Sequence, residues 1–190
     1  MKDIFNRIME IDIKSLFSEE KKRKGIAKYA EILQAFPKVD VREDRGFQKK
    51  FNGFYRVRRN VEWQKIYYST MQQGKTVPLD FEKALRDFYN LTGRVEASFV
   101  SKLIHTLDNN APILDAFVLQ NLGKKMPLCQ GERKIECAVC IYNEIAQWYR
   151  LALLNNAIQT KITEFDLCFP EYSWFSRTKK LDFLLWQMRE

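Results

Sequence analysis

Residues 91–122 read LTGRVEASFVSKLIHTLDNNAPILDAFVLQNL, and this stretch decides both the fold and the candidate site. Apolar residues recur at helical spacing on both sides of Gly93, and the polar run 108–110 ends the second of the two helices. Asp115 is the only charged residue in the run 111–119. A carboxylate in such apolar surroundings has to be capped, paired or protonated, because isolated burial of its charge costs several kcal/mol. The role of Asp115 is therefore the central question that the sequence raises.

Helical periodicity runs through most of the chain and predicts an all-α fold. Asn60 and Asp80 are expected N-caps, because their side chains can accept hydrogen bonds from the first turn of a helix. Residues 38–59 show no clean period, so we expect a loop or short strands around residues 54–58, and we expect residues 157–175 to be irregular. The expected helices cover residues 3–17, 19–36, 61–73, 80–91, 95–107, 112–123, 132–156 and 176–188.

Length and composition indicate a folded protein. The chain has 190 residues, of which 46% are hydrophobic and 14% aromatic, so it can bury enough apolar surface to offset its conformational entropy. It contains no apolar stretch long enough to cross a membrane, and its N-terminus lacks the apolar segment of a signal peptide. We therefore expect one all-helical domain over residues 1–190 in a soluble, cytoplasmic protein without a membrane partner. A division into two lobes, with the second at residues 79–123, is left open, as is the oligomeric state.

Basic residues are concentrated in one stretch. The protein has a net charge of +8, and residues 42–59 alone hold seven Lys or Arg and two Asp or Glu, a net charge of +5. Such an excess suits a polyanion, because Coulomb attraction and counterion release both favour binding. The simpler interpretation is a solvated basic surface.

Aromatic and cationic residues are interleaved at the end of this stretch, in Phe54-Tyr55-Arg56-Val57-Arg58-Arg59. Aromatic rings stack on bases and arginines bind phosphates, so the combination is typical of nucleic-acid contacts. We expect Arg56, Arg58 and Arg59 to bind the phosphate backbone of DNA. The alternative is a basic surface segment whose aromatic side chains enter the core.

The turn Leu91-Thr92-Gly93-Arg94 joins two expected helices. A tight turn at glycine exposes backbone N–H groups of the turn and of the following helix. These groups bind phosphate well, because they lack partners and lie at the positive end of the helix dipole. Gly93 and Arg94 are therefore candidate phosphate contacts, and Lys102, expected on the polar face of the next helix, is a third candidate for contact with DNA.

These features resemble the helix-hairpin-helix superfamily of DNA glycosylases. Its members carry a Leu-Pro-Gly-Val-Gly hairpin, a helix that begins with small residues, and a Val-Asp-Thr-His-Val segment that contains the catalytic aspartate. The corresponding positions within residues 91–122 are held by Gly93, Ala97, Asp115 and Val118. The resemblance implies binding of double-stranded DNA and flipping of a base out of the duplex. It also implies cleavage of the glycosidic bond with Asp115 as the catalytic carboxylate, without a cofactor or metal.

The chain departs from the family pattern in three respects. It has a single hairpin glycine, the spacing from Gly93 to Asp115 is slightly longer than in the family, and Val95 takes the position of the Schiff-base lysine of bifunctional members. Lys102 lies two turns further along its helix and is not assigned that role. The resemblance therefore implies a monofunctional enzyme that hydrolyses the glycosidic bond.

An interpretation from a different class assigns Asp115 no chemistry. An aspartate three residues after a proline is a common helix N-cap, worth about 1 kcal/mol. The protein is then a non-catalytic nucleic-acid-binding or protein-interaction module on the same fold. A capping carboxylate can also be a catalyst, so the two roles of Asp115 are compatible.

Four cysteines raise the question of a metal site, since four thiolates suffice in number for zinc or an iron–sulfur cluster. Cys137 and Cys140, however, fall inside an expected helix without the Gly or Pro turns of a metal-binding knuckle. We therefore expect Cys129, Cys137, Cys140 and Cys168 to pack as small buried hydrophobic residues, and no metal site.

Other residues are assigned structural or solvated roles. His105 is the only histidine, and we expect it on the polar side of its helix, in solvent or near a phosphate, with Glu96 also facing outward. The helix over residues 132–156 is apolar on every side and is expected at the centre of the domain. The tryptophans Trp63, Trp148, Trp174 and Trp186 are expected to anchor the core.

Three cations, Arg177, Lys179 and Lys180, fall in the first turns of the last expected helix. This placement opposes the preference of the helix dipole for negative charge at its N-terminus. Either an external anion such as phosphate relieves the conflict, or Asp182 or Glu171 neutralises the cations.

Overall fold

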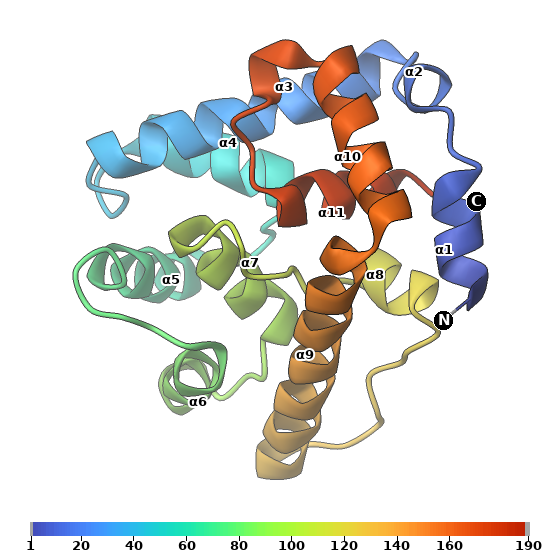
Figure 1. Ribbon diagram of the computed structural model, residues 1–190. Coiled ribbons are helices and arrows are strands. Elements are labelled where there is room, and N and C mark those ends of the chain that lie inside the picture. The colour runs from blue at the N-terminus through green and yellow to red at the C-terminus, as the bar shows by residue number, and fades with distance from the viewer. Residues whose placement is uncertain (1, 189–190) are drawn as a thin grey trace.

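The computed structural model describes residues 2–188 and shows an all-α protein, as the periodicity predicts (Figure 1). The described residues contain two short 3-10 helices, at Phe36–Lys38 and Pro170–Tyr172, and no strand. None of their helices is long and apolar enough to cross a bilayer. The α-helices are α1 (Lys2–Met9), α2 (Ile13–Leu16), α3 (Glu20–Ala35), α4 (Arg45–Tyr55), α5 (Val61–Gln73), α6 (Phe81–Thr92), α7 (Ala97–Leu107), α8 (Ala116–Asn121), α9 (Gly131–Leu154), α10 (Asn156–Cys168) and α11 (Arg177–Gln187).

Short-range sequence signals set several helix boundaries. The side chain of Asn60 accepts a hydrogen bond from the Trp63 backbone N–H at 3.0 Å, and Asp80 accepts one from the Lys83 N–H at 2.8 Å, so both predicted N-caps are confirmed. Gly93 ends α6 with a left-handed φ of +67°, a conformation that glycine adopts without steric cost.

Residues 45–55 form α4, so the expectation of a loop or short strands is wrong for this part of the segment, whereas residues 56–60 do form a loop. Phe47, Phe51 and Tyr55 recur every four residues and are buried on one face of this helix. Asp44 caps it by accepting a hydrogen bond from the Phe47 N–H at 2.7 Å. Only these three aromatic residues carry the helical period, and the many charged residues between them made it hard to recognise in the sequence.

Residues 156–168 form α10, so the expected irregular structure is wrong for residues 157–168 and is found only at residues 169–175, where a 3-10 turn and bends follow. Asn155 caps this helix, and Ile158, Ile162 and Phe165 are buried along one side. Lys161 is buried on the same face, where its Nζ donates to the Ile11 carbonyl oxygen at 2.8 Å. A buried lysine at a core position lowered the apparent hydrophobicity of the segment.

The centre of the core is α11 and not α9. Every residue of α11 from Thr178 to Leu185 is buried, and the helix packs against α8, α9 and α10 (Figure 1). α9 buries one face only, while Leu151 and Leu154 on its other side are 54% and 74% exposed. The expectation of a central helix over residues 132–156 is therefore wrong, because apolar residues around a helix do not require partners on every side.

Two of the three cations at the start of α11, Lys179 and Lys180, are neutralised internally. The Nζ of Lys179 lies 2.6 Å from Asp182 Oδ2, and their side chains are 3% and 5% exposed. Lys180 pairs in the same way with Asp166 at 2.6 Å. Lys179 also lies over the rings of Tyr29 and Phe183, at 4.5 and 4.6 Å from their centroids. Internal carboxylates therefore neutralise Lys179 and Lys180, with Asp182 as expected and Asp166 in place of Glu171. Arg177 is exposed and donates to the Leu153 carbonyl oxygen at 3.2 Å.

Asp182→Ala should lower the free energy of unfolding by about 3–5 kcal/mol, because it leaves the Lys179 ammonium buried without its counter-ion. Urea denaturation measures the loss. Asp87→Ala is the matched control, since Asp87 pairs with Lys83 one helical turn away on an exposed surface and its loss should change stability little. Equal losses of unfolding free energy in the two variants would contradict the prediction that breaking the buried Lys179–Asp182 pair costs more than breaking an exposed pair.

Candidate functional site

Asp115 lines a pocket of about 290 Å³ that is enclosed by α4, α7, α8 and α11. This volume lies near the lower end of the roughly 300–1,000 Å³ typical of small-molecule sites. Most of the lining is apolar, and four half-buried aromatic rings contribute to it: Phe54, Phe99, Phe117 and Trp186. The charged side chains of the lining are Arg56, Lys102, Asp115, Lys179 and Asp182.

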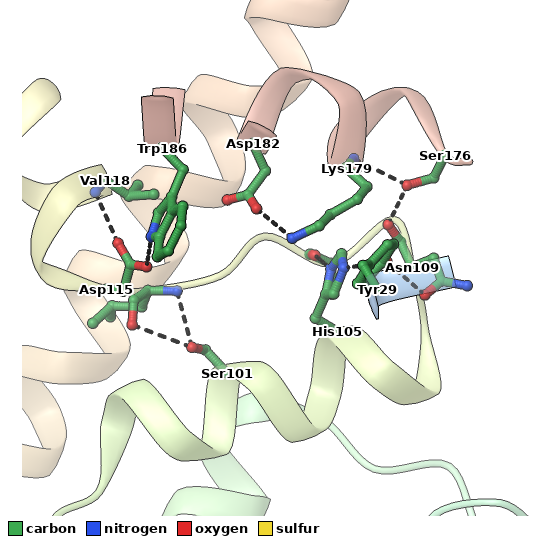
Figure 2. Close-up of polar contacts among 12 residues, drawn as sticks. Tyr29, Ser101, His105, Asn109, Asp115, Val118, Ser176, Lys179, Asp182 and Trp186 are labelled. Carbon is green, nitrogen blue, oxygen red and sulfur yellow. Dashed lines mark hydrogen bonds and ion pairs between the residues drawn. The ribbon is translucent and has the colours of Figure 1, made fainter. Parts of the chain in front are cut away.

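Asp115 is the N-cap of α8, as the sequence predicts. Its Oδ1 accepts hydrogen bonds from the backbone N–H groups of Phe117 at 3.0 Å and Val118 at 2.9 Å. Its Oδ2 accepts a third, from the indole N–H of Trp186 at 2.9 Å (Figure 2). The carboxylate is therefore fixed by three donors while it remains half-buried at the wall of the pocket.

The pKa of Asp115 reflects opposing influences. Burial raises the pKa above its ordinary value, and the nearby carboxylate of Asp182 raises it further. The hydrogen bond from Val118, the positive charge of Lys102 and the hydrogen bond from Trp186 act in the other direction. Asp115 thus combines a desolvated position with a set of donors that stabilises its ionised form.

Two buried side chains of α7 hold the segment that leads to Asp115. Ser101 Oγ accepts a hydrogen bond from the Leu114 N–H at 2.9 Å and donates toward the Leu114 carbonyl oxygen at 3.3 Å. One turn further along, His105 Nδ1 lies 2.7 Å from the Ala111 carbonyl oxygen (Figure 2). The extended backbone between α7 and α8 is therefore fastened at two points, and Asp115 follows directly.

His105 is fully buried, so its expected place in solvent or near a phosphate is wrong. The carbonyl of Ala111 can only accept, which makes His105 Nδ1 the donor, and His105 Nε2 then accepts from the Tyr29 hydroxyl at 2.7 Å. Burial lowers the pKa of His105 to about 3, with a further contribution from the positive charge of Lys179. His105 is a neutral structural residue.

Lys102 lies at the pocket and not on an exposed polar face, so its expected orientation is wrong. Its side chain is half-buried, its Nζ donates to Ser98 Oγ at 3.2 Å, and it lies 5.2 Å from the centre of the Phe99 ring. Burial lowers the pKa of Lys102, although the carboxylates of Asp115 and Asp182 partly offset this. The structure therefore places an amine and the candidate catalytic carboxylate in the same pocket.

A second hollow, of about 410 Å³, lies beside the turn at Gly93. Arg58, Arg59 and Arg94 line it, and Arg58 and Arg94 are exposed. Arg59 is instead paired internally, with its Nε 2.9 Å from Glu96 Oε1.

Glu96 is 9% exposed, so the expectation that it faces outward is wrong. Its side chain is held in the ion pair with Arg59 and does not cap α7.

The predicted aromatic and cationic stretch is divided between core and surface. Tyr55 is buried, while Phe54 lines the pocket that contains Asp115. Arg56 is exposed at the mouth of the same pocket and ends α4 with a left-handed φ of 55°. The burial of Tyr55 agrees with the interpretation in which aromatic side chains of this stretch enter the core, and contact of its arginines with nucleic acid stays a prediction.

Sequence reasoning missed several residues of the site. Ser101 and His105 stand four residues apart in α7, and this spacing was a usable signal for a shared hydrogen-bonded face. Trp186 and Gln187 had no such signal, because Trp186 reaches Asp115 across 71 residues of sequence.

The cysteines and tryptophans depart in part from expectation. Cys140 is exposed and the other three cysteines are only partly buried, so the expected burial of these residues is wrong. Residues 2–188 contain no cluster of three or more His, Cys, Asp or Glu suited to a metal ion. Trp63 and Trp148 anchor the core as predicted, whereas Trp174 is 47% exposed and Trp186 lines the pocket.

No family model matches the chain, and comparisons with curated proteins and with solved structures give no significant match. We therefore infer function from the chemistry and geometry of the site itself.

The burial of neutral His105 predicts a loss of stability in mild acid. The unfolded chain takes up a proton on His105 near its ordinary pKa of 6.5, whereas the folded chain does so only near pH 3. The contribution of neutral His105 to the free energy of unfolding is therefore fully present above pH 6.5. This contribution falls as the pH decreases toward 3, by up to about 1.4 kcal/mol per pH unit. Urea denaturation between pH 7 and 5 measures the slope, and His105→Gln should flatten it. If the unfolding free energy of the wild-type protein does not change between pH 7 and 5, the assignment of His105 as a buried, neutral residue is contradicted.

Proposed function

We propose that the protein binds double-stranded DNA and hydrolyses the N-glycosidic bond of a flipped nucleotide, with Asp115 as the catalytic carboxylate. The observation that carries the proposal is the position of Asp115, a fixed carboxylate on the wall of a small, aromatic-lined pocket. A residue that serves only as a cap needs no such pocket.

The pocket suits a nucleobase. Phe54, Phe117 and Trp186 supply ring faces and edges on which a base can stack, and base–aromatic stacking contributes about 1–3 kcal/mol for each base. Base flipping brings the target sugar to the wall of such a pocket, because the base occupies its interior. Asp115 then stands beside the anomeric carbon.

The chemistry assigned to Asp115 is electrostatic. Positive charge develops on the sugar as the glycosidic bond breaks, and a nearby carboxylate stabilises that charge and can orient the attacking water. The three N–H groups that donate to Asp115 stabilise its ionised form and fix its position. Its partly desolvated position strengthens the interaction with the sugar.

The backbone of the duplex is assigned to the surface around the Gly93 turn. Arg58 and Arg94 are exposed on the second hollow, and Arg56 is exposed at the pocket mouth. No side chain caps the N-terminus of α7 directly after the turn, and such a helix end favours phosphate. Arg59 is assigned only a supporting role in phosphate binding, because its guanidinium is already paired with Glu96.

The position of Lys102 favours a second candidate reaction. A partly desolvated amine with a lowered pKa is a better nucleophile than an ordinary lysine, and the half-buried Lys102 shares the pocket with Asp115. Attack by this amine in place of water would form a Schiff base with the sugar and lead to cleavage of the DNA strand.

Asp115→Asn should lower the rate of base excision at least about a hundredfold while the protein stays folded, because asparagine still caps a helix but carries no charge. Alkali treatment of duplexes that contain one uracil, alkylated or oxidised base reveals excision as strand breaks. Asp80→Asn is the matched control, because Asp80 is an exposed N-cap outside the pocket, and it should retain full activity.

Two results of this assay would change the assignment. Wild-type protein that is inert on every duplex would contradict the enzyme and leave a non-catalytic module. Strand breaks that form before alkali and disappear in Lys102→Gln would replace hydrolysis by the Schiff-base reaction.

Arg94→Gln should weaken duplex binding and reduce the slope of log K against log salt by about 0.9, since one phosphate contact is lost. Fluorescence anisotropy at several salt concentrations measures both quantities. Lys14→Gln is the control, because it removes one exposed cation from α2, far from the Gly93 turn (Figure 1). An equal effect of the two variants would show non-specific attraction only, and no binding at all would favour a protein-interaction module.

A further inference from the structure

Lys102 is a half-buried cation of the pocket that lacks a carboxylate partner. Its Nζ donates to Ser98 Oγ at 3.2 Å, and it forms no ion pair within residues 2–188. The fully buried lysines of this part of the chain each pair with a carboxylate: Lys161 with Glu164, Lys179 with Asp182 and Lys180 with Asp166. A desolvated ammonium without a counter-ion costs free energy, so Lys102, with two N–H bonds to spare, suits an anion from outside the chain.

Arg56 brings a second cation to the same pocket. Its side chain is exposed and forms no hydrogen bond or ion pair with the rest of the described chain. Its backbone has a left-handed φ of 55°, a conformation in which glycine meets less steric cost than a residue with a side chain. A long cationic side chain therefore stands at a position where the turn alone favours glycine.

The carboxylates of the pocket do not neutralise these two cations. Asp115 accepts three N–H groups, and Asp182 lies 2.6 Å from Lys179 Nζ. Burial lowers the pKa of Lys102, the two carboxylates offset this only in part, and the nearby charge of Arg56 lowers it further. An ammonium that is disfavoured both by burial and by a second cation gains from an anion that approaches both cations.

Aromatic rings lie beside the cations of the pocket. Phe99 has the Nζ of Lys102 at 5.2 Å from its ring centre, and the ring centres of Phe117 and Trp186 are 5.7 Å apart in an edge-to-face arrangement. The pocket holds about 290 Å³. A complementary ligand is therefore small and combines a flat ring with an anionic group.

We propose that the pocket binds a nucleotide together with its own phosphate, with the base against the aromatic rings and the phosphate against Lys102 and Arg56. A nucleotide joins a flat ring to an anion through one sugar, and its phosphate oxygens accept charge-assisted hydrogen bonds from lysine and arginine. This inference goes beyond base excision, because it requires neither a duplex nor cleavage of a bond. The phosphate belongs either to a free nucleoside monophosphate or to a nucleotide within a strand.

Titration with a free nucleotide tests the site without DNA. Protein labelled with ¹⁵N is titrated at low salt with 2′-deoxyuridine 5′-monophosphate and with 2′-deoxyuridine, and the Trp186 indole N–H signal reports binding in the pocket. The monophosphate should bind at least about tenfold more tightly, because only this ligand forms charge-assisted hydrogen bonds to the two cations.

Substitution of the two cations should reduce this preference and leave the fold intact. Lys102→Met and Arg56→Gln should each reduce the preference for the monophosphate by at least about threefold and leave the binding of 2′-deoxyuridine unchanged. Lys102→Arg keeps the cation and should keep most of the preference. Lys134→Met is the matched control and should behave as wild type, because Lys134 is a half-buried lysine of α9 outside the pocket.

An ester of the phosphate distinguishes the two sources of the ligand. The methyl ester of the monophosphate carries a single negative charge, as a phosphate within a strand does. Binding of the ester as tight as that of the free monophosphate supports the site and assigns it to a nucleotide within a strand. Binding of the monophosphate alone supports the site and assigns it to a free nucleotide.

Equal binding of the monophosphate and the nucleoside, or no binding of either, would overturn the inference. A preference that survives in both Lys102→Met and Arg56→Gln would also overturn it, as would an equal loss in Lys134→Met, which would show general attraction to a basic protein. Failure of the proposed function gives a different result. Protein that binds the monophosphate selectively and excises no base contradicts only the enzyme, whereas excision without any preference for the phosphate contradicts only this inference.

Discussion

The site depends on the way in which α7 holds the extended segment of residues 111–114. This backbone is buried, and its N–H and carbonyl groups need partners because they are withdrawn from water. Ser101 and His105 supply partners for Leu114 and Ala111 from adjacent turns of one helix face. The register of this attachment fixes where α8 begins, and therefore where its first carboxylate, Asp115, lies. Without it, Asp115 would be an N-cap of undefined position.

The interior of the pocket carries charges that packing alone does not require. Lys179 and Asp182 are buried as a pair, which contributes little net stability compared with a well-packed apolar pair. Lys102 and Asp115 lie near them with opposite charges and shifted pKa values. Such groupings are more frequent at functional sites than elsewhere in proteins.

One helix connects the two surfaces that the proposed function uses. The N-terminal half of α7 contacts Arg59, which lines the hollow at the Gly93 turn, and itself lines the pocket at Asp115. Phe99 on this helix has Arg59 near its ring at 5.1 Å and Lys102 at 5.2 Å. A duplex held at the turn would therefore lie within reach of the pocket, and the rigid helix would set the distance between backbone contact and chemistry.

The sequence by itself determined the all-α class and the N-caps Asn60, Asp80 and Asp115. These features depend on hydrogen bonds and apolar spacings within a few residues of chain, which a single sequence displays directly. Only the tertiary structure decided that His105 is buried and neutral and that Trp186 fixes Asp115. Burial depends on which distant helix covers a face, and the helix that covers this one, α11, lies some seventy residues away and carries no local mark of its partner.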